Sequence, residues 1–192
     1  MIQTDRFEQV EITHVQQLRE WLMNHHDQSE SIWLVTFKKN VPSNYVDRWD
    51  VLDELICFGW IDGIRRKLDD QRTMQLISPR RVQHWAQTYK DRAARLIAED
   101  RMHQHGLKSI AESKKAGLWD FMADVDRLET PKDLQAALAN DPQAHTFYTQ
   151  LADAKKRFAL RWLKLAKTDE TRARRIAKII HHFSKGETLP GS

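Results

Sequence analysis

Short stretches rich in apolar and β-branched residues predict four strands in the first half of the chain. The strongest is residues 31–37, whose nearly continuous apolar character favours a central strand. Residues 7–12 alternate weakly between polar and apolar side chains and predict a first strand. Residues 60–67 and 73–78 predict two more strands, joined by a short polar turn.

Apolar residues at helical spacing predict three helices among these strands. Thr13 and Asp47 are the expected N-caps of the first two. Ser78 followed by Pro79 is typical of a helix start, so we expect the third helix to begin there and to extend to about residue 98. The predicted order is strand, helix, strand, helix, strand, strand, helix.

The second half of the chain predicts helices alone. No stretch after Gly106 resembles a strand, and Pro131 marks the start of one helix. A single long helix is expected over residues 144–167, and a last helix begins at Thr168 and is ended by Gly186. The predicted fold class is α+β: a small, mostly antiparallel sheet of about four strands covered by helices, followed by a helical C-terminal part.

Length and composition set limits on this prediction. With 192 residues, 41% of them hydrophobic, the chain can bury a sizeable core, and we expect one compact unit made of residues 1–125 and 126–192. Cys57 is the only cysteine, which excludes a disulfide framework. The longest apolar stretch, residues 55–61, is too short to span a bilayer, so we expect a cytoplasmic protein without a transmembrane segment.

The formal net charge of +4 is unevenly distributed. Residues 155–185 hold 11 Lys and Arg but only two acidic residues, so this segment carries +9 and the remainder −5. The basic side chains of two predicted amphipathic helices form stripes opposite the apolar faces: Arg157, Arg161 and Lys164, then Arg174 and Lys178. Such a surface suits nucleic acid, an anionic membrane or an acidic protein, although no nucleic-acid-binding motif accompanies it. The alternative is a solvated helix face without a partner.

Five motifs, in this order along the chain, carry a resemblance to a known family. They are Cys57-Phe58-Gly59-Trp60-Ile61-Asp62-Gly63, Ser78-Pro79-Arg80-Arg81 with Trp85, Ala116-Gly117-Leu118-Trp119, Trp162-Leu163-Lys164-Leu165-Ala166-Lys167, and Glu170-Thr171-Arg172-Ala173-Arg174-Arg175-Ile176. With them the chain resembles the YdeI/OmpD-associated proteins, also called bacteriocin-protection proteins. Residues 147–186 look like the helical domain that defines the family. The resemblance implies a role in stress or bacteriocin protection, and it brings no reaction or residue roles.

An aromatic side chain, a carboxylate and several guanidinium groups come close together if the two strands after residue 60 pair. These candidate ligand-binding residues are Trp60, Asp62, Arg65, Arg80, Arg81 and Trp85. Arginine forks bind carboxylate and phosphate groups, so the cluster predicts a pocket for a small anion. The structural alternative is that Asp62 pairs with one arginine, Gly63 permits a turn or bulge, and Trp60 belongs to the core.

Familiar catalytic and metal-binding motifs do not match the chain. The close histidines, such as His25-His26 and His103 with His105, lack the spacing of known metal motifs, so we expect no metal site and no cofactor. Cys57 is expected in the core and not as a nucleophile. The leading hypothesis is a non-enzymatic stress or bacteriocin-protection protein that acts by binding. A small-anion-binding protein or enzyme, and a binder of nucleic acid or anionic surfaces, are the alternatives.

Overall fold

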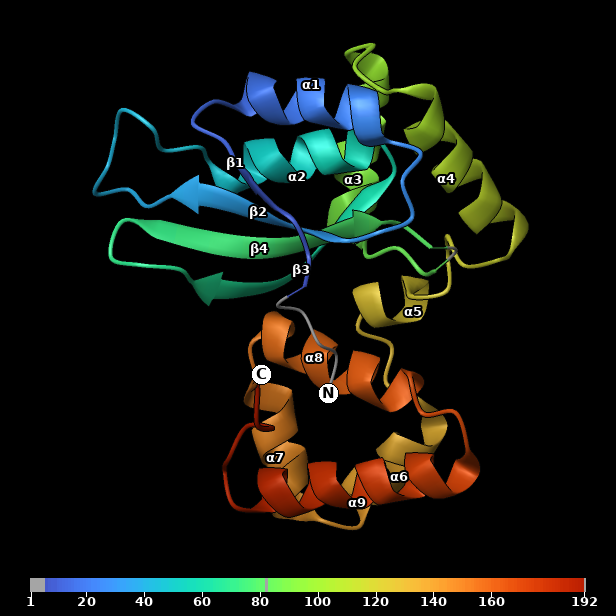
Figure 1. Cartoon of the computed structure of the whole chain (residues 1–192). Helices are drawn as coiled ribbons and strands as arrows, with labels where there is room; N and C mark the ends of the chain where they lie inside the picture. Colours follow the sequence, from blue (N-terminus) through green and yellow to red (C-terminus); the bar gives the residue numbers. More distant parts are fainter. Residues whose placement is uncertain (1–5, 82, 192) are drawn as a thin grey trace. The chain divides into compact units, whose positions relative to one another are not determined.

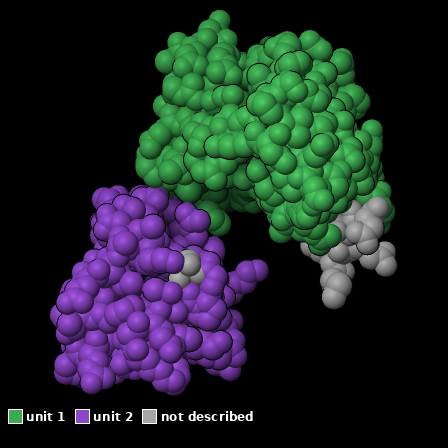
Figure 2. Space-filling model, turned by 90° about the vertical axis from the view of Figure 1, so that its left-hand side faces the viewer, with its two compact units in different colours: residues 1–120 green, residues 121–192 purple. Residues whose placement is uncertain are grey.

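The computed structural model describes residues 6–81 and 83–191, and the chain forms two compact units (Figure 2). Unit 1 is Met1–Asp120 and unit 2 is Phe121–Ser192. Each unit encloses its own cluster of buried hydrophobic side chains.

Unit 1 is built on a four-stranded sheet. Its elements are β1 (Gln9–Glu11), α1 (Val15–His25), β2 (Ile32–Phe37), α2 (Arg48–Cys57), β3 (Trp60–Lys67), β4 (Arg72–Pro79), α3 (Gln87–Ala98) and α4 (Gln104–Lys115). The strand order is β1-β2-β4-β3, and only the β1–β2 pair is parallel. The mostly antiparallel sheet and the predicted order of elements are confirmed.

Helices α1, α2 and α3 cover one face of this sheet (Figure 1). Ile32 and Leu34 on β2 and Ile77 on β4 are fully buried, and they share this face because directly paired residues point to the same side. Each such side chain contributes about 1.5–3 kcal/mol by leaving water. Leu55 and Ile56 supply the facing apolar surface of α2.

Helix α2 also buries two carboxylates. Asp53 is 5% exposed and pairs with Arg92 at 2.7 Å and with Arg95. Glu54 is 3% exposed and pairs with Arg19 at 2.8 Å and with Arg101 at 2.7 Å. Because a buried carboxylate without a partner is very costly, these pairs tie α1, α3 and the segment before α4 to α2.

The predicted start of the third helix at Ser78 and Pro79 is wrong. Both residues belong to β4, where they pair with Ile61 and Trp60 of β3. The Ser78 hydroxyl is also 2.7 Å from that of Ser31 on the segment before β2. Strand pairing therefore outweighs the local capping signal, and α3 begins only at Gln87.

Two glycines allow the beginning of α4 to approach the end of α2 closely. A Cβ atom on Gly106 would lie only 2.3 Å from the carbonyl oxygen of Cys57. Gly59 has a positive φ of 71°, and a Cβ atom there would lie 3.0 Å from the carbonyl oxygen of His105. The amide of His103 donates to the Cys57 carbonyl at 3.0 Å, which completes this junction.

The regular elements in the described part of unit 2 are all helices, as predicted. These are α5 (Ala123–Asp126), α6 (Lys132–Ala139), α7 (Pro142–Gln150), α8 (Asp153–Lys164) and α9 (Asp169–Ser184). The single long helix expected over residues 144–167 is wrong, because Leu151 and Ala152 have extended backbone with ψ near 140°. The break lets α7 and α8 each pack against α9 as separate helices.

Several local signals are confirmed. The Asp47 carboxylate accepts from the amide of Trp49 at 2.8 Å, and the Thr168 hydroxyl accepts from the amide of Thr171 at 3.1 Å. Gly186 follows α9 with φ of 70°. The first cap is His14, one position after the expected Thr13.

None of the helices within residues 6–81 and 83–191 is long and apolar enough to cross a membrane.

We predict that Gly106→Ala destabilises unit 1 by at least about 1–3 kcal/mol, because the added methyl group must displace the backbone of Cys57. Chemical denaturation followed by circular dichroism measures the change. Lys108→Ala, on the exposed side of the same helix, is the matched control and should stay within about 0.5 kcal/mol of wild type. Equal stability of the two variants would contradict the proposed close packing.

Candidate functional site

A bulge in β3 places Asp62 and Arg65 on the same face of the sheet. The register of β3 against β4 shifts between these two residues. In a regular strand, residues three apart point to opposite faces, so the extra residue is needed to bring the two side chains together. Gly63 suits this bulge because a Cβ atom there would lie 3.1 Å from the carbonyl oxygen of Leu76.

A cavity of about 390 Å³ opens at this face, and we call it the α2 pocket. Its lining residues come from α2, β3, β4 and α3: Arg48, Trp49, Val51, Leu52, Leu55, Asp62, Arg65, Gln75, Thr88 and Tyr89. Val51, Leu52 and Leu55 are buried and form an apolar floor, whereas Trp49 is 45% exposed. A concave apolar surface with a few polar groups is the usual form of a ligand site.

Asp62 is held in one orientation within the α2 pocket. The hydroxyl of Tyr89 donates to its Oδ1 atom, and Nε2 of Gln75 donates to its Oδ2 atom at 3.3 Å. Because each carboxylate oxygen has two acceptor positions, both oxygens can still accept from a ligand. Asp62 is thus an oriented acceptor, supported from α3 on one side and β4 on the other.

Two guanidinium groups line the same pocket. Arg65 donates from Nη2 to Oε1 of Gln75 at 2.6 Å, so Gln75 links Arg65 to Asp62. Arg48 lies 4.4 Å from the ring of Trp49, and Arg92 lies at the same distance from that ring. With one carboxylate and two guanidinium groups, the ionisable lining carries a formal charge of +1.

Arg80 contacts the pocket wall without lining the cavity. Its guanidinium lies 3.8 Å from the ring centre of Trp85 and 5.6 Å from that of Tyr89, and Nη2 donates to the carbonyl of His84 at 3.2 Å. Its Nε and Nη1 atoms are buried and have no hydrogen-bond partner within the described residues. Burial lowers the pKa of Arg80 to about 10, despite the opposing effects of Tyr89 and Asp62.

The remaining residues predicted for the site lie elsewhere in unit 1. Trp60 and Trp85 are fully buried, and Nε1 of Trp85 donates to the hydroxyl of Ser113 at 2.9 Å. Arg81 is exposed and lines a separate hollow beside Glu30. Of the six predicted residues, the structure brings only Asp62 and Arg65 into the α2 pocket.

The prediction did not include Arg48, Gln75 and Tyr89 in the site. A signal for Gln75 exists in the sequence, because the regular register from the hairpin turn places it opposite Arg65. Arg48 follows the cap Asp47 and so begins α2, but its position over the pocket depends on how the helix packs. Tyr89 comes from α3, whose start was wrongly predicted at Ser78 and Pro79.

Cys57 is a core residue, as predicted. Its side chain is fully buried at the end of α2. Burial, together with the nearby Glu54 carboxylate, raises the pKa of Cys57 to about 11, which keeps the thiol protonated at neutral pH.

The basic side chains predicted on unit 2 fall into two groups. Lys164 pairs with Asp124, and Arg157 lies 3.7 Å from the carboxylate of Asp153. The others are exposed and have no charged partner within the described part of the chain: Arg161, Arg174 and Lys178. Binding of nucleic acid or an anionic surface through these helices stays a prediction.

Comparisons with known families find two matches. A family model described as a domain of unknown function (DUF8412) matches residues 10–109, which is more than half of the chain. A model described as "Bacteriocin-protection, YdeI or OmpD-Associated" matches residues 127–186, within unit 2, and confirms the predicted family resemblance. A search of curated proteins and a search of solved structures found no match.

We predict that Arg80→Met raises the free energy of unfolding at neutral pH by about 1 kcal/mol, because it removes a buried cation with two unpartnered nitrogens. Chemical denaturation measures the change, with the exposed Arg81→Met as matched control. The pKa of Arg80 is lower in the folded state than its ordinary value of 12.5, so the free energy of unfolding of the wild type increases as the pH rises through about 10. The difference in this free energy between wild type and Arg80→Met therefore becomes smaller at high pH. A loss of stability in Arg80→Met would mean that its contact with Trp85 outweighs the cost of burial.

Proposed function

Because the chain belongs to the DUF8412 family and carries a C-terminal bacteriocin-protection, YdeI or OmpD-associated domain, we propose that it is a cytoplasmic, non-enzymatic stress or bacteriocin-protection protein that binds a small anionic molecule. The α2 pocket of unit 1 is the binding site in this proposal. The observation that carries it is the Asp62–Gln75–Arg65 arrangement on an apolar floor.

The polar groups of the pocket favour a ligand with an anionic group. Arg65 has five N–H donors, and only Gln75 accepts from it within the described residues. The remaining donors suit a carboxylate or phosphate, which a guanidinium fork binds through two parallel hydrogen bonds. Arg48 adds a second positive charge to the same cavity.

A second polar group on the ligand is favoured by Asp62. Its carboxylate is fixed by Tyr89 and Gln75, and it is an acceptor for an ammonium or hydroxyl group. An anionic group at Arg65 and a donor at Asp62 together describe a small zwitterion or hydroxy acid. The apolar floor at Leu52 and Leu55 suits the carbon skeleton between them.

A binding role agrees with the states of Cys57 and Asp62. Cys57 is buried as a protonated thiol at neutral pH. Asp62 is engaged by a donor at each oxygen, an arrangement that orients a carboxylate for recognition.

We predict that isothermal titration calorimetry detects binding of at least one of three probes: inorganic phosphate, succinate and L-glutamate. Arg65→Ala should weaken that binding about tenfold or more, because it removes a charge-assisted pair of hydrogen bonds. Asp62→Asn should weaken L-glutamate more than phosphate, since only L-glutamate brings an ammonium group to the carboxylate.

Lys67→Ala is the matched control, because Lys67 is an exposed cation on the same strand and lies outside the pocket lining. This variant should bind the probe as wild type does. The proposal is overturned if folded wild-type protein binds none of the three probes, or if Arg65→Ala and Lys67→Ala bind equally well.

A further inference from the structure

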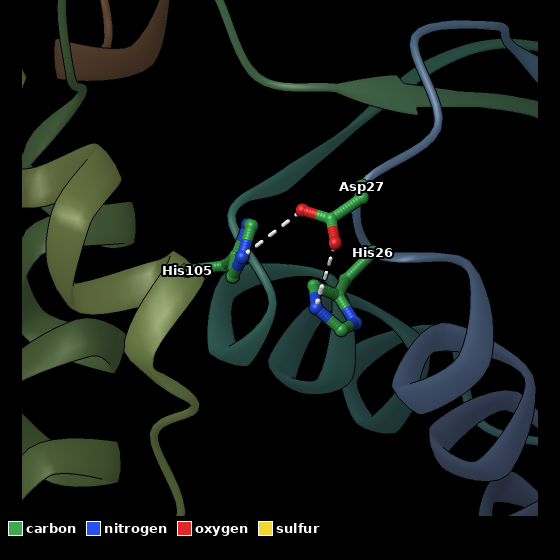
Figure 3. Close-up of side chains that lie close together, drawn as sticks. All are labelled: His26, Asp27 and His105. Carbon is green, nitrogen blue, oxygen red and sulfur yellow. Dashed lines mark ion pairs between the residues drawn. The ribbon is translucent and has the colours of Figure 1, made fainter.

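Three side chains from distant parts of the sequence meet where α1 ends and α4 begins. His26 and Asp27 follow the last turn of α1, and His105 lies in the first turn of α4. The candidate ligand atoms of these three residues all lie within 4.8 Å of one another. Figure 3 shows the carboxylate of Asp27 between the two imidazole rings.

Two nitrogen–oxygen distances in this cluster are close to the ligand–ligand distance of a tetrahedral metal site. Nε2 of His26 is 3.4 Å from one oxygen of Asp27, and Nε2 of His105 is 3.2 Å from the other. A zinc ion about 2.0–2.1 Å from each ligand atom places tetrahedrally arranged ligand atoms about 3.3 Å apart. The rings of His26 and His105 are also close, with centroids 4.2 Å apart.

The hydrogen bonding of His26 prepares it as a ligand. Its Nδ1 atom lies 2.8 Å from the backbone carbonyl of Met23, which can only accept, so Nδ1 carries the proton. In the neutral ring Nε2 then holds a lone pair that faces the Asp27 carboxylate. Two facing lone pairs repel each other unless a proton or a metal ion lies between them, and a backbone carbonyl on the distal nitrogen is the usual support for a metal-bound histidine.

The position of His105 is fixed by the tight junction between α2 and α4. Gly106 and Gly59 permit the close approach, and the amide of His103 donates to the carbonyl of Cys57. His103 itself stacks on Phe58, with ring centroids 4.9 Å apart. The backbone of His105 is therefore held by close packing, whereas the side chain of Asp27 is 78% exposed.

We propose that His26, Asp27 and His105 bind one divalent transition-metal ion of the zinc class. Two imidazole nitrogens and one carboxylate suit zinc, and disfavour magnesium and calcium, which prefer oxygen ligands. With three protein ligands, water occupies the fourth position on the side open to solvent. The ion joins the end of α1 to the beginning of α4.

This proposal does not rest on the proposed function. The α2 pocket is lined by residues 48–55 of α2, whereas the histidine cluster is anchored at Cys57 and Phe58, after that stretch. Loss of one site therefore leaves the other to be tested separately.

The experiment uses the full chain, without a histidine tag and stripped of metal with a chelator. Calorimetric titration with zinc chloride should show one ion per chain, and cobalt(II) should give the visible spectrum of a tetrahedral site. Zinc should also raise the unfolding temperature, because it binds only the folded arrangement of these three residues.

His105→Ala and Asp27→Asn are the test variants. Each should weaken zinc binding by about 100-fold or more, since even supporting residues around a metal cost about 10–100-fold. Asp27→Asn keeps the shape of an exposed side chain, so it separates loss of a ligand from loss of folding. His25→Ala is the matched control, because His25 is an exposed neighbour with its Nδ1 atom 2.7 Å from the Trp21 carbonyl.

The proposal is overturned if the wild-type protein shows no one-to-one zinc binding. It is equally overturned if folded Asp27→Asn binds zinc as tightly as His25→Ala does. In either case the three side chains contact one another without a metal ion.

Discussion

The burial of two carboxylates on α2 is the constraint on which the rest of unit 1 depends. Asp53 and Glu54 are adjacent in sequence, point to different sides of the helix, and are almost inaccessible to water. Each needs guanidinium partners, and these come from α1, from α3 and from Arg101 before α4. Since an unpaired buried carboxylate costs several kcal/mol, the helices around α2 have little freedom to shift.

The same helix positions both candidate sites. Its first turn, begun by the Asp47 cap, carries Arg48 and Trp49 to the rim of the α2 pocket, and Arg92 joins Trp49 to the buried Asp53. The carbonyl of Cys57, the last residue of α2, accepts a hydrogen bond from the amide of His103, just before α4. This contact helps to set the position of His105. A pocket wall fixed in this way is largely formed before a ligand arrives, which reduces the entropy lost on binding.

Features that depend on neighbouring residues were predictable from the sequence, and features that depend on packing were not. The caps at Asp47 and Thr168 and the glycine after α9 rest on contacts within a few residues, and all three are confirmed. The Ser78-Pro79 signal failed because β3 competes for the same backbone. The amphipathic pattern of α2 does not predict the burial of Asp53, because its partners on α3 lie about 40 residues further along the chain. In the same way Asp62 and Arg65 lie close together in the sequence and were predicted for one site, whereas His26 and His105 come together only through the fold.

Ion pairs reduce the local excess of positive charge on the C-terminal helices. Residues 155–185 alone carry +9, but their cations find acids outside that window, such as Lys164 with Asp124 and Arg172 with Asp133 at 2.5 Å. Counted by compact unit, unit 2 holds 13 Lys and Arg against nine acids, and unit 1 holds 18 of each. The whole excess of +4 therefore belongs to unit 2, while several arginines of the neutral unit 1 pair with buried carboxylates or line the α2 pocket. Long-range attraction of an anionic macromolecule would act on unit 2, whereas recognition of a small anion in unit 1 depends on the local geometry of Arg65 and Asp62.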